Sequence, residues 1–288
     1  MPALGVDVGG TSLRVCAVAG GVRSKVLARP VPTRYEALLD AIGELAAELG
    51  AATTGPVVVG LPGATGPSVP TWIPALPWLD RRPLADDLAD RLGATTVTLA
   101  NDAQLGLLGE ASEGAARGAS NAALVSVGTG IGGAIMLGGR IVRGAHGTAG
   151  SFGWLPSAGY TPTPDHGGLE LAASGRALDR MAGPGRAGRD VVAAALAGEP
   201  TARETLDTWA SALGEGLAAL ASVLDPEIVV LAGGLCDAFD VYAEAMLSAL
   251  RRAGSPDARH VSVVPAALGS HSQVVGASIA AMSGKVWS

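Results

Sequence analysis

Aromatic residues, charged residues and cysteines are all scarce in this chain of 288 residues. Phe, Trp and Tyr make up 3% of it, too few for the stacking platform that single-stranded nucleic acid needs. Charged residues make up 16%, the net charge is −6 and no basic cluster exists, so no nucleic-acid partner is expected. No apolar run reaches the ~18 residues of a membrane span, and a signal-peptide pattern is missing. Cys16 and Cys236 lie far apart and are interpreted as free thiols of a cytoplasmic protein.

Small and apolar residues are abundant instead, with 48% hydrophobic residues, 42 glycines and 18 prolines, as is typical of an α/β protein with tight turns. Alternation and turn residues predict a first series of strands at 3–8, 13–19, 25–31, 57–59 and 96–100. A capping box formed by Thr33 and Glu36 predicts one helix, and Pro83 begins a second. A third helix is expected after the strand at 96–100 and ends near residue 117. The pattern then restarts, with strands at 122–127, 132–137, 140–142, 227–231 and 261–264, and helices near 169–182, 188–197, 201–224, 239–252 and from 272. The restart predicts a duplicated α/β unit that faces itself across a cleft.

Three glycine-rich turns follow predicted strands, at residues 9–11, 128–133 and 232–234. Gly9 and Gly10 allow backbone N–H groups to approach phosphate oxygens, and Thr11 adds a hydroxyl donor. Asp7 carries the charge that would hold Mg²⁺ or its water shell. One such turn is usually only a turn, whereas three of them in α/β units are better explained by a bound nucleotide.

Asn101 and Asp102 end another predicted strand, and two interpretations are open. Both residue types are preferred helix N-caps, and a helix follows. Alternatively, Asp102 is a general base that accepts a proton from a substrate hydroxyl as it attacks a γ-phosphate.

Together these motifs resemble the ROK family of sugar kinases and sugar-responsive repressors, over nearly the whole chain. The resemblance rests on four segments: Asp7-x-Gly9-Gly10-Thr11, Asn101-Asp102-Ala103 with Gly109-Glu110, Gly128-Thr129-Gly130-Ile131-Gly132 and Leu231-Ala232-Gly233-Gly234. It implies an actin/hexokinase-like (ribonuclease H-like) fold, duplicated around a central cleft. The expected domains are 1–116, with the C-terminal helix from about 270 to 288 packed on it, and 117–269. Since the first phosphate motif begins at residue 7, a kinase-type member without a DNA-binding domain is expected. The resemblance also implies a homodimer.

The family's roles imply an ATP- and Mg²⁺-dependent kinase that phosphorylates a primary hydroxyl of a sugar or sugar-like cyclic polyol. Asp102 is then the general base, and Asp7 holds metal-bound water. The other residues divide into phosphate ligands (Gly9, Gly10, Thr11, Gly128, Thr129, Gly130), a turn beneath adenosine (Gly233, Gly234) and acceptor contacts (Gly63, Asn101, Ser151, Trp154, Glu170).

The chain departs from the family at the acceptor side. Where the family has Gly-Glu-x-Gly-His, this chain has Gly150-Ser151-Phe152-Gly153-Trp154. The family's zinc-binding Cys-x-Cys-Gly-x-x-Gly-Cys-Leu-Glu run appears as residues 161–170, without a cysteine. No structural zinc is therefore expected, and His166 is interpreted as a histidine of a surface loop.

These departures predict an altered acceptor. Ser151 and Trp154 replace a charged wall with a small hydroxyl and a flat apolar face, which favours a modified hexose or a C7-cyclitol over plain glucose. Trp154 has a second interpretation, as a side chain that fills the volume vacated by the zinc loop. The alternative functions are an ordinary glucokinase or N-acylhexosamine kinase, and a sugar or metabolite sensor that keeps the fold without turnover.

Overall fold

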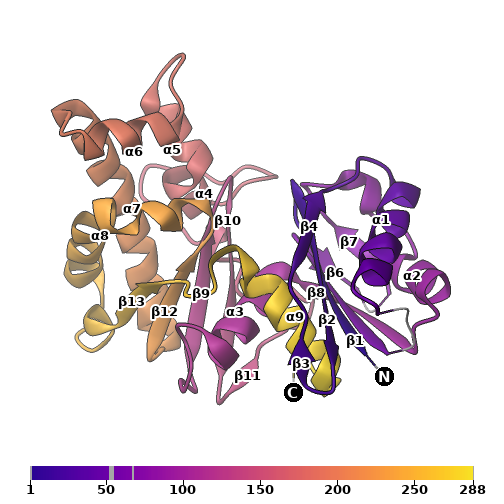
Figure 1. The fold of residues 1–288 in the computed structure, drawn as a ribbon. Coiled ribbons are helices and arrows are strands. Elements are labelled where there is room, and N and C mark those ends of the chain that lie inside the picture. The colour runs from indigo at the N-terminus through magenta and orange to yellow at the C-terminus, as the bar shows by residue number, and fades with distance from the viewer. Residues whose placement is uncertain (1, 52–54, 67, 288) are drawn as a thin grey trace. The chain divides into compact units, whose positions relative to one another are not determined.

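The computed structural model describes residues 2–51, 55–66 and 68–287. Its internal contacts divide the chain into two units, and its strands form two large sheets (Figure 1). Unit 1 comprises Met1–Gly118, Ala134–Ala149 and Ala267–Ser288, and unit 2 comprises Ala119–Gly133 and Gly150–Ala266. The expected domain division differs from these units mainly in residues 134–149, whose contacts lie with unit 1.

The sheet of unit 1 has the order β3-β2-β1-β5-β8, and β4 pairs with β2. Its strands are β1 (Ala3–Val8), β2 (Ser12–Ala19), β3 (Val22–Arg23), β4 (Leu27–Pro30), β5 (Pro56–Leu61) and β8 (Thr96–Asn101). Antiparallel pairing joins β1 to β2, whereas β1, β5 and β8 run parallel. The carboxyl ends of β1 and β8 therefore meet at one edge of the sheet, which is where Asp7 and Asn101 lie. A separate hairpin consists of β6 (Ala64–Thr65) and β7 (Pro70–Trp72).

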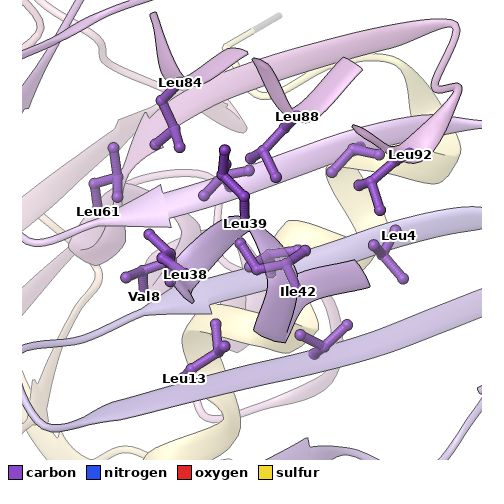
Figure 2. Close-up of a cluster of buried hydrophobic side chains, with 14 of the residues drawn as sticks. Leu4, Val8, Leu13, Leu38, Leu39, Ile42, Leu61, Leu84, Leu88 and Leu92 are labelled. Atoms are coloured by element: carbon purple, nitrogen blue, oxygen red, sulfur yellow. The ribbon is translucent and has the colours of Figure 1, made fainter. Parts of the chain in front are cut away.

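Helices cover both faces of this sheet. α1 (Tyr35–Glu48) and α2 (Leu84–Leu92) bury leucines at helical spacing against Leu4, Val8 and Leu13, as Figure 2 shows. α3 (Asp102–Glu113) and α9 (Ser272–Ser283) cover the other face. α9, yellow in Figure 1, packs closely on β1: a Cβ at Gly5 would lie 2.5 Å from the Ser278 nitrogen. Short 3-10 helices span Pro77–Leu79 and Gly269–His271.

The sheet that includes the strands of unit 2 repeats this topology, with the order β11-β10-β9-β12-β13. Its strands are β9 (Ala122–Val127), β10 (Ile131–Leu137), β11 (Arg140–Ile141), β12 (Ile228–Ala232) and β13 (Ser262–Pro265), and β10 continues past Gly133 into residues counted with unit 1. The helices of unit 2 are α4 (Gly168–Ala173), α5 (Gly175–Ala182), α6 (Gly188–Leu196), α7 (Pro200–Leu224) and α8 (Phe239–Ala253), with 3-10 helices at Phe152–Trp154, Gly234–Ala238 and Ala258–His260. As in unit 1, parallel strands (β9, β12 and β13) follow a meander. The predicted duplication of an α/β unit is confirmed.

Several local predictions are wrong. Arg34, not Thr33, precedes α1, and no side-chain cap bond forms there. The helix expected over 169–182 is broken at Ser174, whose hydroxyl caps α5 at the Ala177 N–H. α3 ends at Glu113 rather than near residue 117, because Gly114 takes an extended conformation. No helix in the described ranges is both long and apolar enough to span a bilayer.

Candidate functional site

The first glycine turn joins β1 to β2 in unit 1. The Gly9 N–H donates to the Ser12 carbonyl at 2.9 Å, so Gly9 shapes the turn itself. In the described part of the chain, the N–H groups of Gly10 and Thr11 have no protein acceptor. A Cβ at Gly10 would lie 3.3 Å from the Ala75 side chain, which leaves little room for a larger residue. Two adjacent unpaired amides are what a phosphate oxygen requires.

Asp7 lies below this turn and is only 3% exposed. Burial raises the pKa of its carboxyl to about 6, although the Arg14 guanidinium, 3.2 Å from Oδ2, opposes that shift. Arg14 was not predicted as a site residue from the sequence. Arg14 is the cross-strand partner of Asp7 in the antiparallel pair β1 and β2, and the short turn between the two strands could have indicated this contact. A buried carboxylate with a raised pKa fits a cation ligand, since a divalent ion restores the charged form.

Asn101 and Asp102 lie where β8 ends and α3 begins, and Asn101 is the helix N-cap. Its Oδ1 accepts bonds from the N–H groups of Ala103 and Gln104, at 3.0 and 3.2 Å. Its Nδ2 donates to the Gly63 carbonyl at 3.1 Å, which brings together two residues that the sequence analysis placed at the acceptor. The capping interpretation therefore holds for Asn101 and leaves Asp102 available for chemistry.

Asp102 is the first residue of α3 and keeps part of its surface exposed. Loss of hydration raises the pKa of its carboxyl to about 7, and the negative charge of Asp7 raises it further in the same direction. A bond from the Ala103 N–H, at 2.8 Å from Oδ1, opposes the shift. A carboxyl that titrates near neutral pH suits a general base.

The second glycine turn, in unit 2, links β9 to β10. The Gly128 N–H donates to the Gly130 carbonyl at 3.0 Å, and the Gly128 carbonyl accepts from Gly175 at 2.8 Å. Across the described residues, the N–H groups of Thr129 and Gly130 donate to no protein acceptor. A Cβ at Gly130 would lie 2.4 Å from Glu170 Oε2. A larger residue would therefore have to displace the Glu170 carboxylate, and the turn presents two amides as the first one does.

The third glycine turn follows β12 in unit 2. Gly233 has a φ of +92°, and a Cβ there would lie 2.4 Å from the Val127 carbonyl oxygen at the end of β9. The turn thus packs against the strand that leads into Gly128. In unit 2 these two glycine turns lie at neighbouring strand ends, as a shared ligand would need.

The residues of unit 2 that the sequence predicts at the acceptor are Ser151, Trp154 and Glu170. Ser151 precedes a short 3-10 helix and Trp154 is its last residue; both are exposed, Trp154 by 44%. The interpretation of Trp154 as a core side chain is therefore wrong. Glu170 lies on α4, and its Oε2 accepts from the Ile131 N–H at 2.8 Å. A Cβ built at Gly153 would lie 3.4 Å from Glu170 Oε2, so the two segments are adjacent.

His166 is more closely engaged than a histidine of a surface loop. Its Nδ1 lies 2.7 Å from Glu170 Oε1, and its Nε2 lies 3.4 Å from Arg176. The i, i+4 spacing from His166 to Glu170 was a usable signal, but the intervening glycines did not indicate a helix. Among the described residues, no group of three or more His, Cys, Asp or Glu side chains could hold a metal ion.

Known proteins are similar to this chain in both sequence and fold. The model of the ROK family matches residues 3–283. A glucokinase of Streptomyces coelicolor is 31% identical over 316 aligned residues, covering 95% of each chain. The bifunctional enzyme NanE/NanK of Brucella melitensis is 36% identical over 96% of this chain, which spans 53% of that enzyme. A crystal structure of a ROK family glucokinase from Streptomyces griseus, in complex with glucose and AMPPNP, superposes with a TM-score of 0.81 at 29% identity, covering 99% of this chain and 100% of that one.

Proposed function

The chain belongs to the ROK family, and we propose that it is a carbohydrate kinase that transfers the γ-phosphoryl group of ATP to a primary hydroxyl of a sugar. The observation that carries the proposal is Asp102, a carboxyl with a pKa of about 7 at the carboxyl end of a parallel strand. The same unit holds a turn with two amides that donate to no acceptor among the described residues. A structure of a relative with bound glucose and AMPPNP supports a sugar and ATP as the pair of substrates.

In the proposed reaction, Asp102 accepts the proton of the acceptor hydroxyl. The acceptor oxygen forms a bond to the γ-phosphorus, and the bond between that phosphorus and the β–γ bridging oxygen breaks, so that ADP leaves. Asn101 binds the Gly63 carbonyl and caps α3, and so it sets the position from which Asp102 acts. General-base catalysis of this kind contributes about 10²–10⁴-fold to the rate.

Asp7 is the residue suited to hold Mg²⁺ through water. The ion, when bound, neutralises charge that develops on the phosphate oxygens. Arg14 orients the Asp7 carboxylate and favours its ionised form. The amides of Gly10 and Thr11 bind phosphate oxygens in unit 1, and those of Thr129 and Gly130 do so in unit 2.

The acceptor is the less constrained part of the proposal. Glu170 orients an acceptor hydroxyl, while Ser151 and Trp154 line the acceptor side with a small hydroxyl and an exposed indole. We propose that this wall disfavours plain glucose and favours a modified hexose. None of the three relatives is named for a cyclitol, so a cyclitol acceptor rests on the wall alone.

The test is a coupled assay of ADP release with ATP and Mg²⁺ against glucose, mannose, allose, N-acetylmannosamine, N-acetylglucosamine and C7-cyclitols. We expect turnover with at least one hexose derivative and a higher kcat/KM than with glucose. ATP binding with no ADP release on any acceptor would contradict the kinase and favour a sensor. Preference for glucose would leave the kinase intact and remove the role given to Ser151 and Trp154.

A further inference from the structure

His166 belongs to a locally built cluster in unit 2. The His166 N–H donates to the Thr163 hydroxyl at 3.1 Å, and the Thr163 N–H donates back to the His166 carbonyl at 2.9 Å. The next residue, Gly167, packs so tightly that a Cβ there would lie 2.3 Å from both the Gly153 oxygen and the Trp154 Cα. These contacts fix the backbone of His166 and hence the position of the Cα from which its imidazole extends.

Both carboxylate oxygens of Glu170 have a hydrogen-bond partner. Oε1 lies 2.7 Å from His166 Nδ1, and Oε2 accepts from the Ile131 N–H at 2.8 Å. The Glu170 side chain retains 19% of its exposure and the His166 side chain 35%. A glutamate bound at one oxygen only can rotate about its terminal bonds, whereas two bonds on opposite oxygens leave one orientation.

The bonding pattern also assigns the protons of the imidazole. Arg176 NH1, 3.4 Å from His166 Nε2, can only donate, so Nε2 accepts. Nδ1 then carries a hydrogen in the neutral ring and donates it to Glu170 Oε1. The polar chain runs from Arg176 through His166 to Glu170 and ends on the backbone that follows Gly130.

We propose that His166 is a positioning residue for the acceptor: it holds the Glu170 carboxylate in the one orientation that binds an acceptor hydroxyl. The inference rests on the proposed function, in which Glu170 contacts the acceptor. It supplies this chain with an orienting group at a segment where Ser151 and Trp154 provide no charge. Because His166 acts through Glu170, its removal affects acceptor binding and leaves nucleotide binding unchanged.

The test compares three histidine variants of the full chain on the best sugar acceptor found for the wild type. His166→Ala removes the donor, and His166→Asn places an amide N–H near the position of Nδ1. His260→Ala is the matched control, an exposed histidine of the same unit. We expect His166→Ala to raise the KM for the sugar about 10- to 100-fold, as loss of an orienting charge-assisted bond does. His166→Asn should recover most of this loss, and the KM for ATP should stay within twofold in every variant.

A double-mutant cycle with Glu170→Gln separates an indirect role from a direct one. We expect His166→Ala to add less than twofold to the sugar KM in the Glu170→Gln background, because no carboxylate remains to be held. Equal losses in both backgrounds would overturn the proposal. A rise in the KM for ATP, with the sugar KM unchanged, would also overturn it and assign the cluster to the Gly128–Gly130 turn.

Failure of the proposed function is distinguishable from failure of this inference. If the wild type phosphorylates no sugar, both fail, and the wild-type data alone show it. If the wild type turns over and His166→Ala has wild-type constants, only the role of His166 fails. Should His166→Ala not fold, as thermal unfolding would reveal, His166→Asn and the Glu170→Gln background still decide the question through the sugar KM.

Discussion

At the residue scale, two carboxyl groups in unit 1 titrate well above their ordinary range. Asp102 reaches a pKa of about 7 and Asp7 about 6, in both cases chiefly because burial penalises the charged form. The negative charge of Asp7 also raises the pKa of Asp102, whereas the Arg14 guanidinium lowers that of Asp7. Such a pair favours one base that is ready to accept a proton and one ligand that becomes fully ionised when a cation binds.

The raised pKa of Asp102 predicts a pH-dependent rate. Only the ionised carboxylate accepts a proton, so kcat/KM should rise with pH through the region near 7 and level off above it. A cation bound beside Asp7 favours the ionised form of Asp102, so it lowers the pH at which half of the maximal rate is reached. Initial rates from pH 5 to 8.5 with saturating Mg²⁺ and ATP measure the profile. A rate that stays constant down to pH 5 would contradict the assignment.

Asp102 also predicts a stability difference that depends on pH. Because its pKa is higher in the folded than in the unfolded state, the folded state binds the extra proton between about pH 4 and 7. Wild-type stability therefore falls as pH rises through that window, whereas Asp102→Asn avoids the cost. At pH 8 the variant should exceed the wild type by about 1–3 kcal/mol in free energy of unfolding. Urea unfolding at pH 8 and pH 4 measures the gain, which should shrink at pH 4; a gain of equal size at both would refute the argument.

At the scale of elements, the glycine turns could be predicted from the sequence, but the tertiary contacts around them could not. Glycines after apolar runs indicate strand ends, and the turns at Gly9, Gly128 and Gly233 lie there. The break at Ser174 depends on tertiary contacts, since the Ser174 carbonyl accepts the indole N–H of buried Trp209 from α7. The contact between His166 and Glu170 was not predicted for the same reason: it becomes apparent only when α4 begins at Gly168.

The Gly128–Gly130 turn provides a prediction with a matched control. Gly130→Ala would place a Cβ 2.4 Å from Glu170 Oε2, whereas a Cβ at Gly132 would have no described residue within 4 Å. We expect Gly130→Ala to weaken binding of an ATP analogue about tenfold, because the new methyl group displaces the Glu170 carboxylate and the bond from the Ile131 N–H, beside the amides of the turn, is lost. Gly132→Ala should stay within threefold. Calorimetric titration measures both affinities, and equal affinities for the two variants would contradict the account.

Glu110 joins α3 to the segment that precedes α9. Fully buried, its carboxylate accepts from the N–H groups of Ala267 and Leu268 and from the Ser272 hydroxyl. Glu110→Gln keeps the size and removes the charge, so it should cost about 2–5 kcal/mol of stability. The exposed Glu244→Gln on α8 is the control and should change stability by less than about 0.5 kcal/mol. Chemical denaturation measures both variants; equal effects would show that the buried bonds contribute little.

At the scale of the whole molecule, the duplication of an α/β unit is the feature that the sequence predicted best. β2-β1-β5-β8 and β10-β9-β12-β13 follow the same order of a meander and parallel strands. The restart of the pattern after residue 117 was sufficient to predict it, because the period of apolar residues changes at each element. The grouping of residues 134–149 with unit 1 depends on contacts such as that of Arg143 with the Thr65 carbonyl, which no periodicity encodes.

The most direct test of the central claim is the turnover of Asp102→Asn on the acceptor preferred by the wild type. We expect kcat to fall about 10²–10⁴-fold, because the general base is lost while the Asn101 cap and the Gly63 contact remain. Affinity for an ATP analogue, measured alongside, should stay within threefold of the wild type. A fall of less than tenfold, with the variant folded and nucleotide bound, would contradict the role of Asp102 and the mechanism built on it.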